Sequence, residues 1–329
     1  MRTSLRLGAC LAAMTLILSG CGIAQRHSAN GVPSRTEVVV HTGPGGGSDV
    51  FARQVVKMLQ DDKLIDANWP VRNETAGSGI GAMSYLKGRR GREDTIAAIT
   101  PTWIVTPLTL DGAAVSVSDV QPIAGLLVEP QVMAVRADSK YRTAADFIAD
   151  ARAHPDGLVQ VGGSVTATDS LTGQALQSRT KTKWSFLTFS DSGQRIASLL
   201  RGDAQMMIGS TGDFSEQVRA GAIRVIGAVG DKRLAALPNV PTLAEEGVPS
   251  EGLPEEFRGF MGPPDMPAQT VAYYQEQLRK LSTQPDWKKY AESDGDVTKF
   301  LDANQFRTYL AQQQASLKKL VDQLGLASR

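Results

Sequence analysis

The chain contains little of what cysteine, metal or nucleic-acid chemistry would need. Its 329 residues include two cysteines, Cys10 and Cys21, and three histidines. The net charge is +1 and no basic cluster stands out, which argues against a nucleic-acid partner. After the N-terminal apolar run, no second run is long enough to cross a membrane. These shortages exclude disulfide-rich, nucleic-acid-binding and multi-span membrane classes.

Motifs of the common catalytic and metal centres are also missing. G-x-S-x-G, H-E-x-x-H and C-x-x-C do not occur, and metal-ligating residue types are not clustered. His27 lies in a polar N-terminal segment and His154 ends a predicted helix. His41 adjoins a glycine loop, where a lining role is expected rather than catalysis. With no recognisable pair of nucleophile and base, we expect no enzyme activity, no cofactor and no metal.

The N-terminus is typical of an exported protein. Arg2 and Arg6 precede a short apolar run, Leu7–Leu18, which is too short for a stable membrane-spanning helix. The sequence Leu18-Ser-Gly-Cys21 resembles a bacterial lipobox, so we expect residues 1–20 to be a lipoprotein signal peptide and Cys21 to carry lipid. An ordinary cleaved signal peptide is the alternative. Residues 21–35 are polar and predict a tether, which places the mature protein outside the cytoplasm, anchored to the cell membrane.

The mature chain is longer than one hydrophobic core usually needs, so two domains are expected. Short apolar segments alternate with helical patterns, and the pair Thr143 and Asp146 predicts the capped start of one helix. A proline-rich loop region and two long helices end the chain. Strands are predicted at 38–40, 69–72, 95–99, 121–127, 131–137, 158–162, 185–189, 204–208 and 223–228. This alternation indicates an α/β fold with parallel-dominated sheets, which bind ligands beyond the carboxyl ends of their strands.

One stretch, Val38–Leu59, combines a strand, a glycine loop and the start of a helix. Val38–Val40 is β-branched, Gly43–Gly47 contains four glycines and a proline, and Ser48 and Asp49 favour a helix start. The first turn of a helix has unpaired N–H groups and a positive dipole end, and glycines let an anion approach them. The stretch predicts a backbone site for a small anion. A plain tight turn is the alternative.

Polar loops follow the predicted strands of the second half as well. The loop after each of three successive strands is rich in Ser, Thr and Asp, and a further Gly/Ser loop surrounds Ser78 in the first half. One such loop would simply be a helix cap, but three facing two others favour a binding cleft. These loops contain almost no Lys or Arg, so we expect dipoles and hydrogen bonds rather than ion pairs to hold the ligand.

In order along the chain, these segments resemble one protein family. The motifs are Gly43–Asp49, Gly162–Asp169, Phe189–Gly193, Leu200–Asp203, Pro238–Thr242 and Arg258–Gly259. Their order and spacing over about residues 36–325 are similar to those of the substrate-binding proteins of tripartite tricarboxylate transporters, the Bug group. The resemblance implies a two-lobed periplasmic-binding fold of the Venus-flytrap, type II-like form. It implies one lobe from residues 36–128 and the return 231–329, and a second from residues 129–230.

The resemblance also implies a function. Proteins of this group capture a small carboxylate, of the di- or tricarboxylate class, between their lobes and deliver it to membrane-embedded transporter subunits. We therefore expect a monomeric, lipid-anchored solute-binding protein with those partners. A receptor that presents ligand to a membrane kinase is one alternative. A secreted hydrolase is another, which the missing nucleophile–base pair disfavours.

The predicted ligand-binding residues come from both halves. From the first lobe they are Gly46, Gly47, Ser48, Asp49, Ser78 and Gly79, and from the second Ser164, Thr168, Asp169, Ser190 and Thr211. Asp49 could face the cleft or only favour the helix start, and both readings stay open. The chain departs from the family pattern at Thr42, Thr166-Ala167, Ser170 and Phe257. Since these positions lie in or near the cleft, the resemblance does not identify the ligand.

Overall fold

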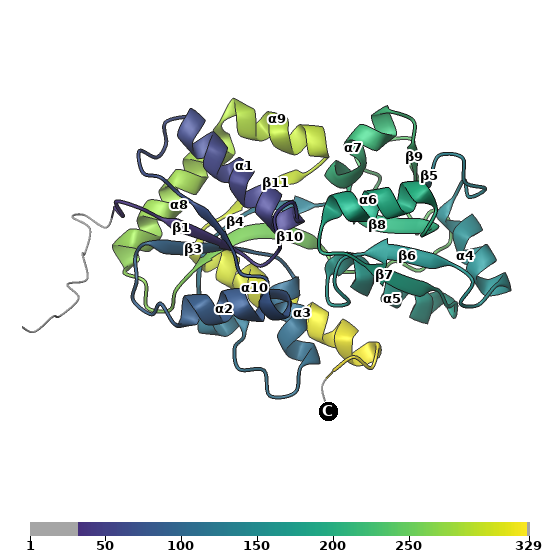
Figure 1. The fold of residues 1–329 in the computed structure, drawn as a ribbon, viewed down its shortest axis with the longest axis horizontal. Helices are drawn as coiled ribbons and strands as arrows, with labels where there is room; N and C mark the ends of the chain where they lie inside the picture. Colours follow the sequence, from purple (N-terminus) through teal and green to yellow (C-terminus); the bar gives the residue numbers. More distant parts are fainter. Residues whose placement is uncertain (1–31, 328–329) are drawn as a thin grey trace, which may run out of the picture.

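The structure is a computed structural model that describes residues 32–327, and in it the chain forms two lobes, each built on its own sheet (Figure 1). The predicted signal peptide, Cys21 and most of the predicted tether lie outside the described residues. Within residues 32–327, no helix has both the length and the apolar character that crossing a membrane requires.

The first lobe contains a six-stranded sheet in the order β11-β4-β10-β3-β1-β2. Its strands are β1 (Glu37–Val40), β2 (Val71–Asn73), β3 (Thr95–Ile99), β4 (Gln121–Glu129), β10 (Glu256–Gly262) and β11 (Val297–Leu301). Its helices are α1 (Gly47–Asp61), η2 (Ala76–Gly79), α2 (Ile80–Lys87), α3 (Thr102–Thr109), η3 (Val117–Asp119), α8 (Ala268–Thr283), α9 (Pro285–Asp294) and α10 (Ala303–Gln323).

The second lobe contains a five-stranded sheet in the order β7-β6-β8-β5-β9. Its strands are β5 (Gln131–Arg136), β6 (Val159–Gly162), β7 (Ser185–Thr188), β8 (Met206–Ser210) and β9 (Ile223–Ala228). Its helices are α4 (Ala144–Ala153), α5 (Thr168–Thr180), α6 (Ser192–Arg201) and α7 (Thr211–Arg219). The chain passes from the first sheet to the second at Pro130 and returns between β9 and β10.

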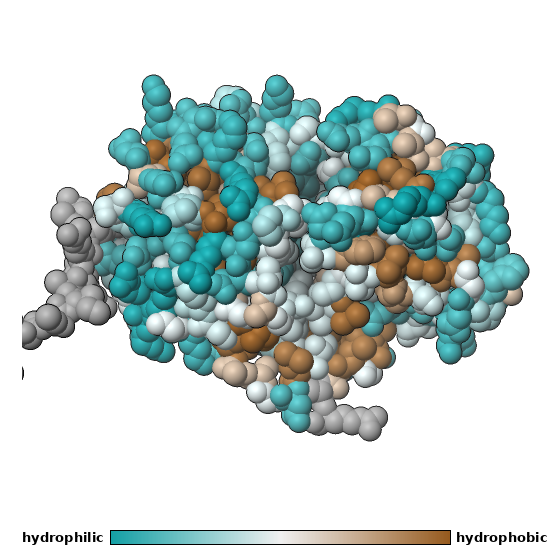
Figure 2. All heavy atoms as spheres, viewed as in Figure 1, coloured by the Kyte–Doolittle hydropathy of each residue, from teal (hydrophilic) through white to brown (hydrophobic). Residues whose placement is uncertain are grey.

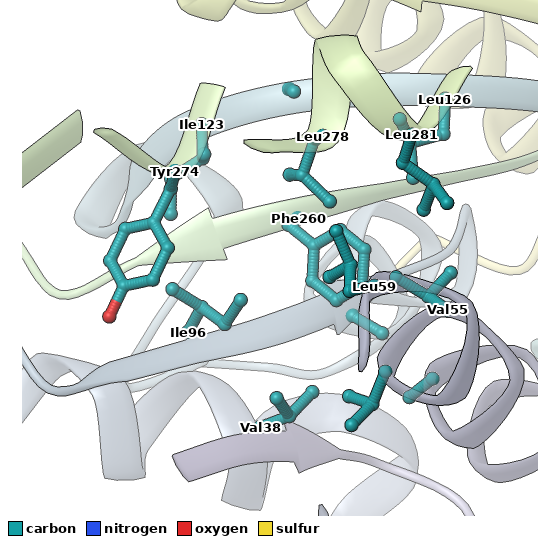
Figure 3. Close-up of a cluster of buried hydrophobic side chains, with 14 of the residues drawn as sticks. Val38, Val55, Leu59, Ile96, Ile123, Leu126, Phe260, Tyr274, Leu278 and Leu281 are labelled. Carbon is teal, nitrogen blue, oxygen red and sulfur yellow. The ribbon is translucent and has the colours of Figure 1, made fainter. Parts of the chain in front are cut away.

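Strand β1 shows why the core strands are continuously apolar. Successive side chains of a strand point to opposite faces, and here both faces are covered. Val38 and Val40 pack into the cluster of Figure 3. Val39 packs on the other face with Trp103 and Met261. All three valines are fully buried, so polar residues at any of them would leave unpaired groups inside the lobe.

Figure 3 shows helices α1 and α8 packed on one face of the first sheet, over strands β1 and β10. Val55 and Leu59 of α1, one turn apart, and Leu278 of α8 point toward Phe260 of β10. Burying a side chain of this size contributes about 1.5–3 kcal/mol. The helix α1 is therefore held firmly on the sheet, and its first turn is fixed at the carboxyl end of β1.

The return segment corrects one prediction. Residues 254–267 were expected to be a loop, but β10 lies in the middle of the first sheet, antiparallel to both β3 and β4. Pro254 and Pro263 flank this strand and do not interrupt it, so no ladder hydrogen bond is lost. Strand β11 and helices α3 and α9 were also not predicted.

The sheets are mixed rather than wholly parallel. Strands β1, β2 and β3 pair in parallel in the first lobe, and β6, β7 and β8 do so in the second. Strand β5 is antiparallel to both of its neighbours. The strand by which the chain enters each lobe, β5 or β10, runs against the parallel set, whereas the strands by which it leaves, β4 and β9, run with that set. The predicted α/β, two-lobed class is confirmed, and in each sheet the three parallel strands lie side by side from one edge.

Candidate functional site

A cavity of about 200 Å³ lies between the lobes, at the carboxyl ends of the parallel strands. Its walls are the segments that follow β1, β3, β6, β7 and β8, together with residues of β4, β5 and β10. A cavity of this size suits a small metabolite rather than an oligosaccharide. Figure 2 shows residues of intermediate hydropathy, drawn near white, where the lobes meet.

Most of the predicted site residues are brought together here. Those that line the cavity are Gly47, Ser48, Ser78, Ser164, Thr168, Asp169 and Ser190. Those that do not line it are Gly46, Asp49, Gly79 and Thr211. The helix starts place the first group, since Gly47 and Ser48 lie in the first turn of α1, Thr168 begins α5, and Ser190 just precedes α6.

The start of α1 presents unpaired donors to the cavity. Gly46 is the N-cap in extended conformation, and the amides of Gly47 and Ser48 donate to no group in the described part of the chain. Gly45 has a φ of +79° and its missing Cβ would lie 2.6 Å from the carboxylate of Asp191 in the other lobe. A side chain is therefore excluded at Gly45 by backbone conformation and by the opposite wall.

Asp49 stabilises this loop from the side away from the cavity. Its carboxylate accepts hydrogen bonds from the amide of Gly45 at 3.0 Å, from Nε of Arg53 at 3.0 Å and from Nδ2 of Asn73 at 2.9 Å. Burial raises the pKa of Asp49, but these hydrogen bonds outweigh it and hold the pKa below its usual value. Asp49 is 3% exposed, so its position favours a structural role over ligand contact.

Thr211 and Gly79 also lie outside the cavity, each for a visible reason. Thr211 donates through Oγ1 to the carbonyl of Pro130 at 3.3 Å, and its side chain packs against Gly295 of the first lobe. Gly79 has a φ of +101°, and a Cβ there would lie 2.9 Å from the ring of Trp103. Thr211 contributes to lobe contact and Gly79 to a tight turn under Ser78.

The start of α5 repeats the arrangement of α1. Asp169 accepts from the amide of Gly163 at 2.7 Å and from its neighbour Ser170 at 2.8 Å, and Nη1 of Arg195 lies 3.4 Å away. Burial raises the pKa of Asp169 despite that arginine. Thr168 is 3% exposed, and its Oγ1 makes no hydrogen bond of normal geometry among the described residues, although it is near enough to Glu256 to oppose the rise in the pKa of that carboxyl. A buried hydroxyl without such a bond in a cavity wall is suited to a ligand.

Sequence reasoning missed a buried ion-pair group in the cavity wall. Arg258 of β10 donates from Nε and Nη2 to Glu129 of β4, both at 2.7 Å. Its Nη1 lies 3.4 Å from Glu256 and 3.4 Å from Oγ of Ser48. These three charged side chains are between 8% and 13% exposed. The loops contain almost no arginine, but Arg258 and Arg195 reach the cavity wall from a strand and a helix, which sequence reasoning did not anticipate.

A sequence signal for this group existed. Glu256 and Arg258 are two residues apart, so in a strand they share one face, and Glu129 lies opposite them on the paired strand. The prolines around 254–264 concealed the strand. Burial and the charge of Arg258 lower the pKa of His41 to about 3, so this cavity residue is neutral at physiological pH.

The lobes touch on both sides of the cavity. On one side Oγ1 of Thr106 lies 3.0 Å from Oγ1 of Thr166. On the other, α7 packs on α9, where a Cβ on Gly212 would lie 3.0 Å from Asp294. Leu171 of the second lobe is buried in a cluster of the first. The lobes thus touch on both sides of the cavity, an arrangement that is called the closed form below.

The comparisons with known proteins agree with this architecture. The family model described as "Tripartite tricarboxylate transporter family receptor" matches residues 52–326. The chain is 23% identical over 321 residues to "UPF0065 protein in gbd 5'region" of Cupriavidus necator, covering 96% of each chain.

Solved structures show the same fold. The periplasmic binding protein BugD has a TM-score of 0.82 at 17% identity, covering 91% of this chain and all of that one. Rpa4515 of R. palustris, solved with adipate, has a TM-score of 0.82 at 20% identity over 89% of this chain and 98% of that one. MatC of Rhodopseudomonas palustris, solved with bound malate, has a TM-score of 0.78 at 18% identity, covering 89% of this chain and 100% of that one.

The match to the family model extends over most of the chain, and the family is one of solute-binding receptors rather than enzymes. The two lobes, the cavity at the strand ends and the absence of a nucleophile–base pair in the sequence agree with that role. The chain belongs to the tripartite tricarboxylate transporter receptor family, the TctC/Bug group of periplasmic solute-binding proteins.

Proposed function

We propose that this protein captures a small carboxylate in the interlobe cavity. The observation that carries the proposal is the pair of helix starts in the cavity wall. Unpaired amides at Gly47 and Ser48 and the unpaired hydroxyl of Thr168 come from different lobes. Backbone amides and helix dipoles favour an anion at each start, and an anion held by both lobes would stabilise the closed form.

Similar proteins support a carboxylate of small size. Two structures with this fold hold adipate and malate, both dicarboxylates. The cavity of about 200 Å³ suits molecules of that size. We propose Gly47, Ser48, Ser78, Ser164, Thr168 and Ser190 as ligand contacts, with Asp169 holding the α5 start in place. Gly46, Asp49, Gly79 and Thr211 would then act on the shape of the cavity or on lobe contact.

The proposal extends to the cell surface. Captured solute would pass to the membrane-embedded subunits of a tripartite transporter, and a lipid on Cys21 would keep the monomeric carrier near them. Support comes from the lipobox-like sequence and from the family. Replacing Cys21 with Ser should leave the precursor unprocessed or release the protein into the soluble extracytoplasmic fraction, measured by fractionation and immunoblotting. Membrane-bound protein of mature size in the Cys21→Ser strain would contradict the anchor.

A thermal-shift screen tests the binding proposal. A ligand that binds only the folded protein at a hundredfold excess over its dissociation constant stabilises it by about 2.7 kcal/mol. We expect some mono-, di- or tricarboxylates or amino acids to raise the melting temperature, and sugars to leave it unchanged. A clear shift with sugars and none with any acid would contradict the proposal.

A further inference from the structure

The cavity wall holds more carboxylates than cations. Among the described residues that line it, the carboxylates are Glu129, Asp169, Asp213 and Glu256, and the guanidinium groups are Arg195 and Arg258. His41 adds no charge, because burial lowers its pKa far below neutrality. A ligand whose only charges are carboxylates would add to an excess of negative charge.

The two arginines are already engaged by protein groups. Arg258 forms a bidentate pair with Glu129 at 2.7 Å for both contacts. Arg195 lies against Asp169 at 3.4 Å and donates from Nη2 to Oγ of Ser192 at 2.7 Å. Both arginines are therefore partly neutralised by protein carboxylates, although Nε of Arg195 has no hydrogen-bond partner among the described residues.

Glu256 is the carboxylate left with least compensation. Its one ion pair among the described residues is the contact with Nη1 of Arg258 at 3.4 Å, longer than the roughly 2.7–2.9 Å of a charge-assisted hydrogen bond, and its one other favourable neighbour is the hydroxyl of Thr168. Asp213, by contrast, accepts from both the amide and the hydroxyl of Ser210 at 3.1 Å. Glu256 is only 13% exposed, so little water compensates its charge.

Glu256 also lies close to the proposed carboxylate site. Nη1 of Arg258 is 3.4 Å from Glu256 and 3.4 Å from Oγ of Ser48, so both groups contact the same guanidinium nitrogen. Ser48 lies in the first turn of α1, where the unpaired amides are. An acceptor for a cation thus stands next to a set of donors for an anion.

From this juxtaposition we propose that the solute is an amino acid, whose carboxylate binds at the α1 start while its adjacent ammonium group binds Glu256. The inference rests on the proposed function and names the ligand class for the same cavity. An ammonium group would neutralise one of the excess carboxylates and donate up to three hydrogen bonds.

Glu256 could bind a ligand in a second way, as a hydrogen-bond donor to a carboxylate, and the experiment must distinguish the two. Burial raises the pKa of Glu256 to about 7, with Arg258 opposing and Glu129 adding to the shift, so a protonated Glu256 could instead donate to a ligand carboxylate. Glutamine mimics the protonated acid. A Glu256→Gln variant would then preserve the binding of plain acids, whereas it would weaken the binding of an ammonium group.

The experiment is calorimetric titration with matched pairs that differ only in the amino group. The pairs are aspartate with succinate, glutamate with glutarate, and norvaline with pentanoate. Each is titrated into the wild type, into Glu256→Gln and into Glu251→Gln, an exposed control outside the cavity. Circular dichroism and the melting temperature verify that each variant is folded.

We expect at least one amino acid to bind the wild type more tightly than its plain partner. Glu256→Gln should weaken that amino acid by about tenfold or more and leave plain acids unchanged or tighter, since a hydrogen bond between charged groups is lost. The Glu251 variant should match the wild type. The inference would be overturned if the wild type bound the plain acids as tightly as the amino acids, or more tightly. It would also be overturned if Glu256→Gln kept the preference for amino acids. Either result would be compatible with the proposed binding of carboxylates. If no acid of either series binds, the proposed function itself fails.

Discussion

At the scale of single residues, the structure separates side chains that face the cavity from those that hold the loops. Ser48 and Asp49 are neighbours in sequence, yet Ser48 lines the cavity and Asp49 turns away toward Gly45, Arg53 and Asn73. Ser48 is not the helix cap, because Gly46 holds that position and no side-chain cap bond is present at α1. Variants at the two positions should therefore affect different measurements.

For Ser48→Ala we expect a loss of ligand affinity with little change in stability. The hydroxyl makes only two long contacts within the protein, both at 3.4 Å, to His41 and Arg258. A lost ligand hydrogen bond of about 0.5–1.5 kcal/mol would weaken binding by roughly two- to twelvefold. Calorimetry and thermal melting measure the two quantities. A lower melting temperature with unchanged affinity would show that the hydroxyl is structural.

For Asp49→Ala we expect a loss of about 2–3 kcal/mol of unfolding free energy, because three donors lose a buried charged acceptor. The lowered pKa of Asp49 means that its stabilisation is present above the usual value of 3.8 and is lost as pH falls through the lower folded value. Urea unfolding of both proteins at pH 7 and at progressively lower pH measures this. Wild-type stability of the variant at pH 7 would contradict the account.

At the scale of elements, the α1 start is the part of the site that sequence predicts best. A strand, a glycine loop and a helix start are read from Val38–Leu59 by local rules alone, and Thr143 indeed caps α4 through the amide of Asp146. The ion pair of Arg258 with Glu129 could not be predicted in this way. Glu129 and Arg258 are far apart in sequence, and only the antiparallel pairing of β4 with β10 brings them together.

Glycine substitutions at the α1 start should depend on where the missing Cβ points. A Cβ on Gly46 would lie 2.6 Å from Thr42 and would distort the loop itself, so that position tests stability rather than binding. A Cβ on Gly47 would face the cavity, 3.0 Å from Nη2 of Arg258. A substitution at Gly47 therefore tests more directly whether the ligand binds at the start of α1.

For Gly47→Ala we expect a folded protein whose carboxylate affinity falls by about tenfold or more, since the methyl group occupies the approach to the free amides. Gly88→Ala at the end of α2 is the matched control, because its Cβ would have ordinary contacts at 3.5 and 3.6 Å. Calorimetric titration compares the two. Unchanged affinity in folded Gly47→Ala would move the ligand away from α1.

At the scale of the whole molecule, closure brings acidic groups of the two lobes together. Asp294 of α9 faces Asp213 and Gly212 of α7, with Glu129 nearby and Arg219 as the opposing cation. Burial raises the pKa of Asp294, and Glu129 and Asp213 add to the rise while Ser293 opposes it. Asp296, close by, has a pKa raised to about 9 by burial and the same acidic neighbours.

The contribution of Asp213 to these raised pKa values comes from the other lobe and is present only when the lobes touch, so ionisation with rising pH works against closure. We expect the unliganded protein to become more open between pH 5 and pH 8, seen as a larger radius of gyration in small-angle scattering. Asp294→Asn should reduce that change, and Asp286→Asn, at the other end of α9, should not. A radius that does not change with pH in the wild type would show that these carboxylates do not influence closure.

The central claim is that a carboxylate bridges the lobes at the starts of α1 and α5. A crystal structure of the protein with the acid that binds it most tightly tests this most directly. We predict carboxylate oxygens within hydrogen-bond distance of the amides of Gly47 and Ser48, with the hydroxyl of Thr168 engaged by ligand or by a bridging water. A ligand bound outside this cavity, or one whose carboxylate contacts neither helix start, would contradict the account.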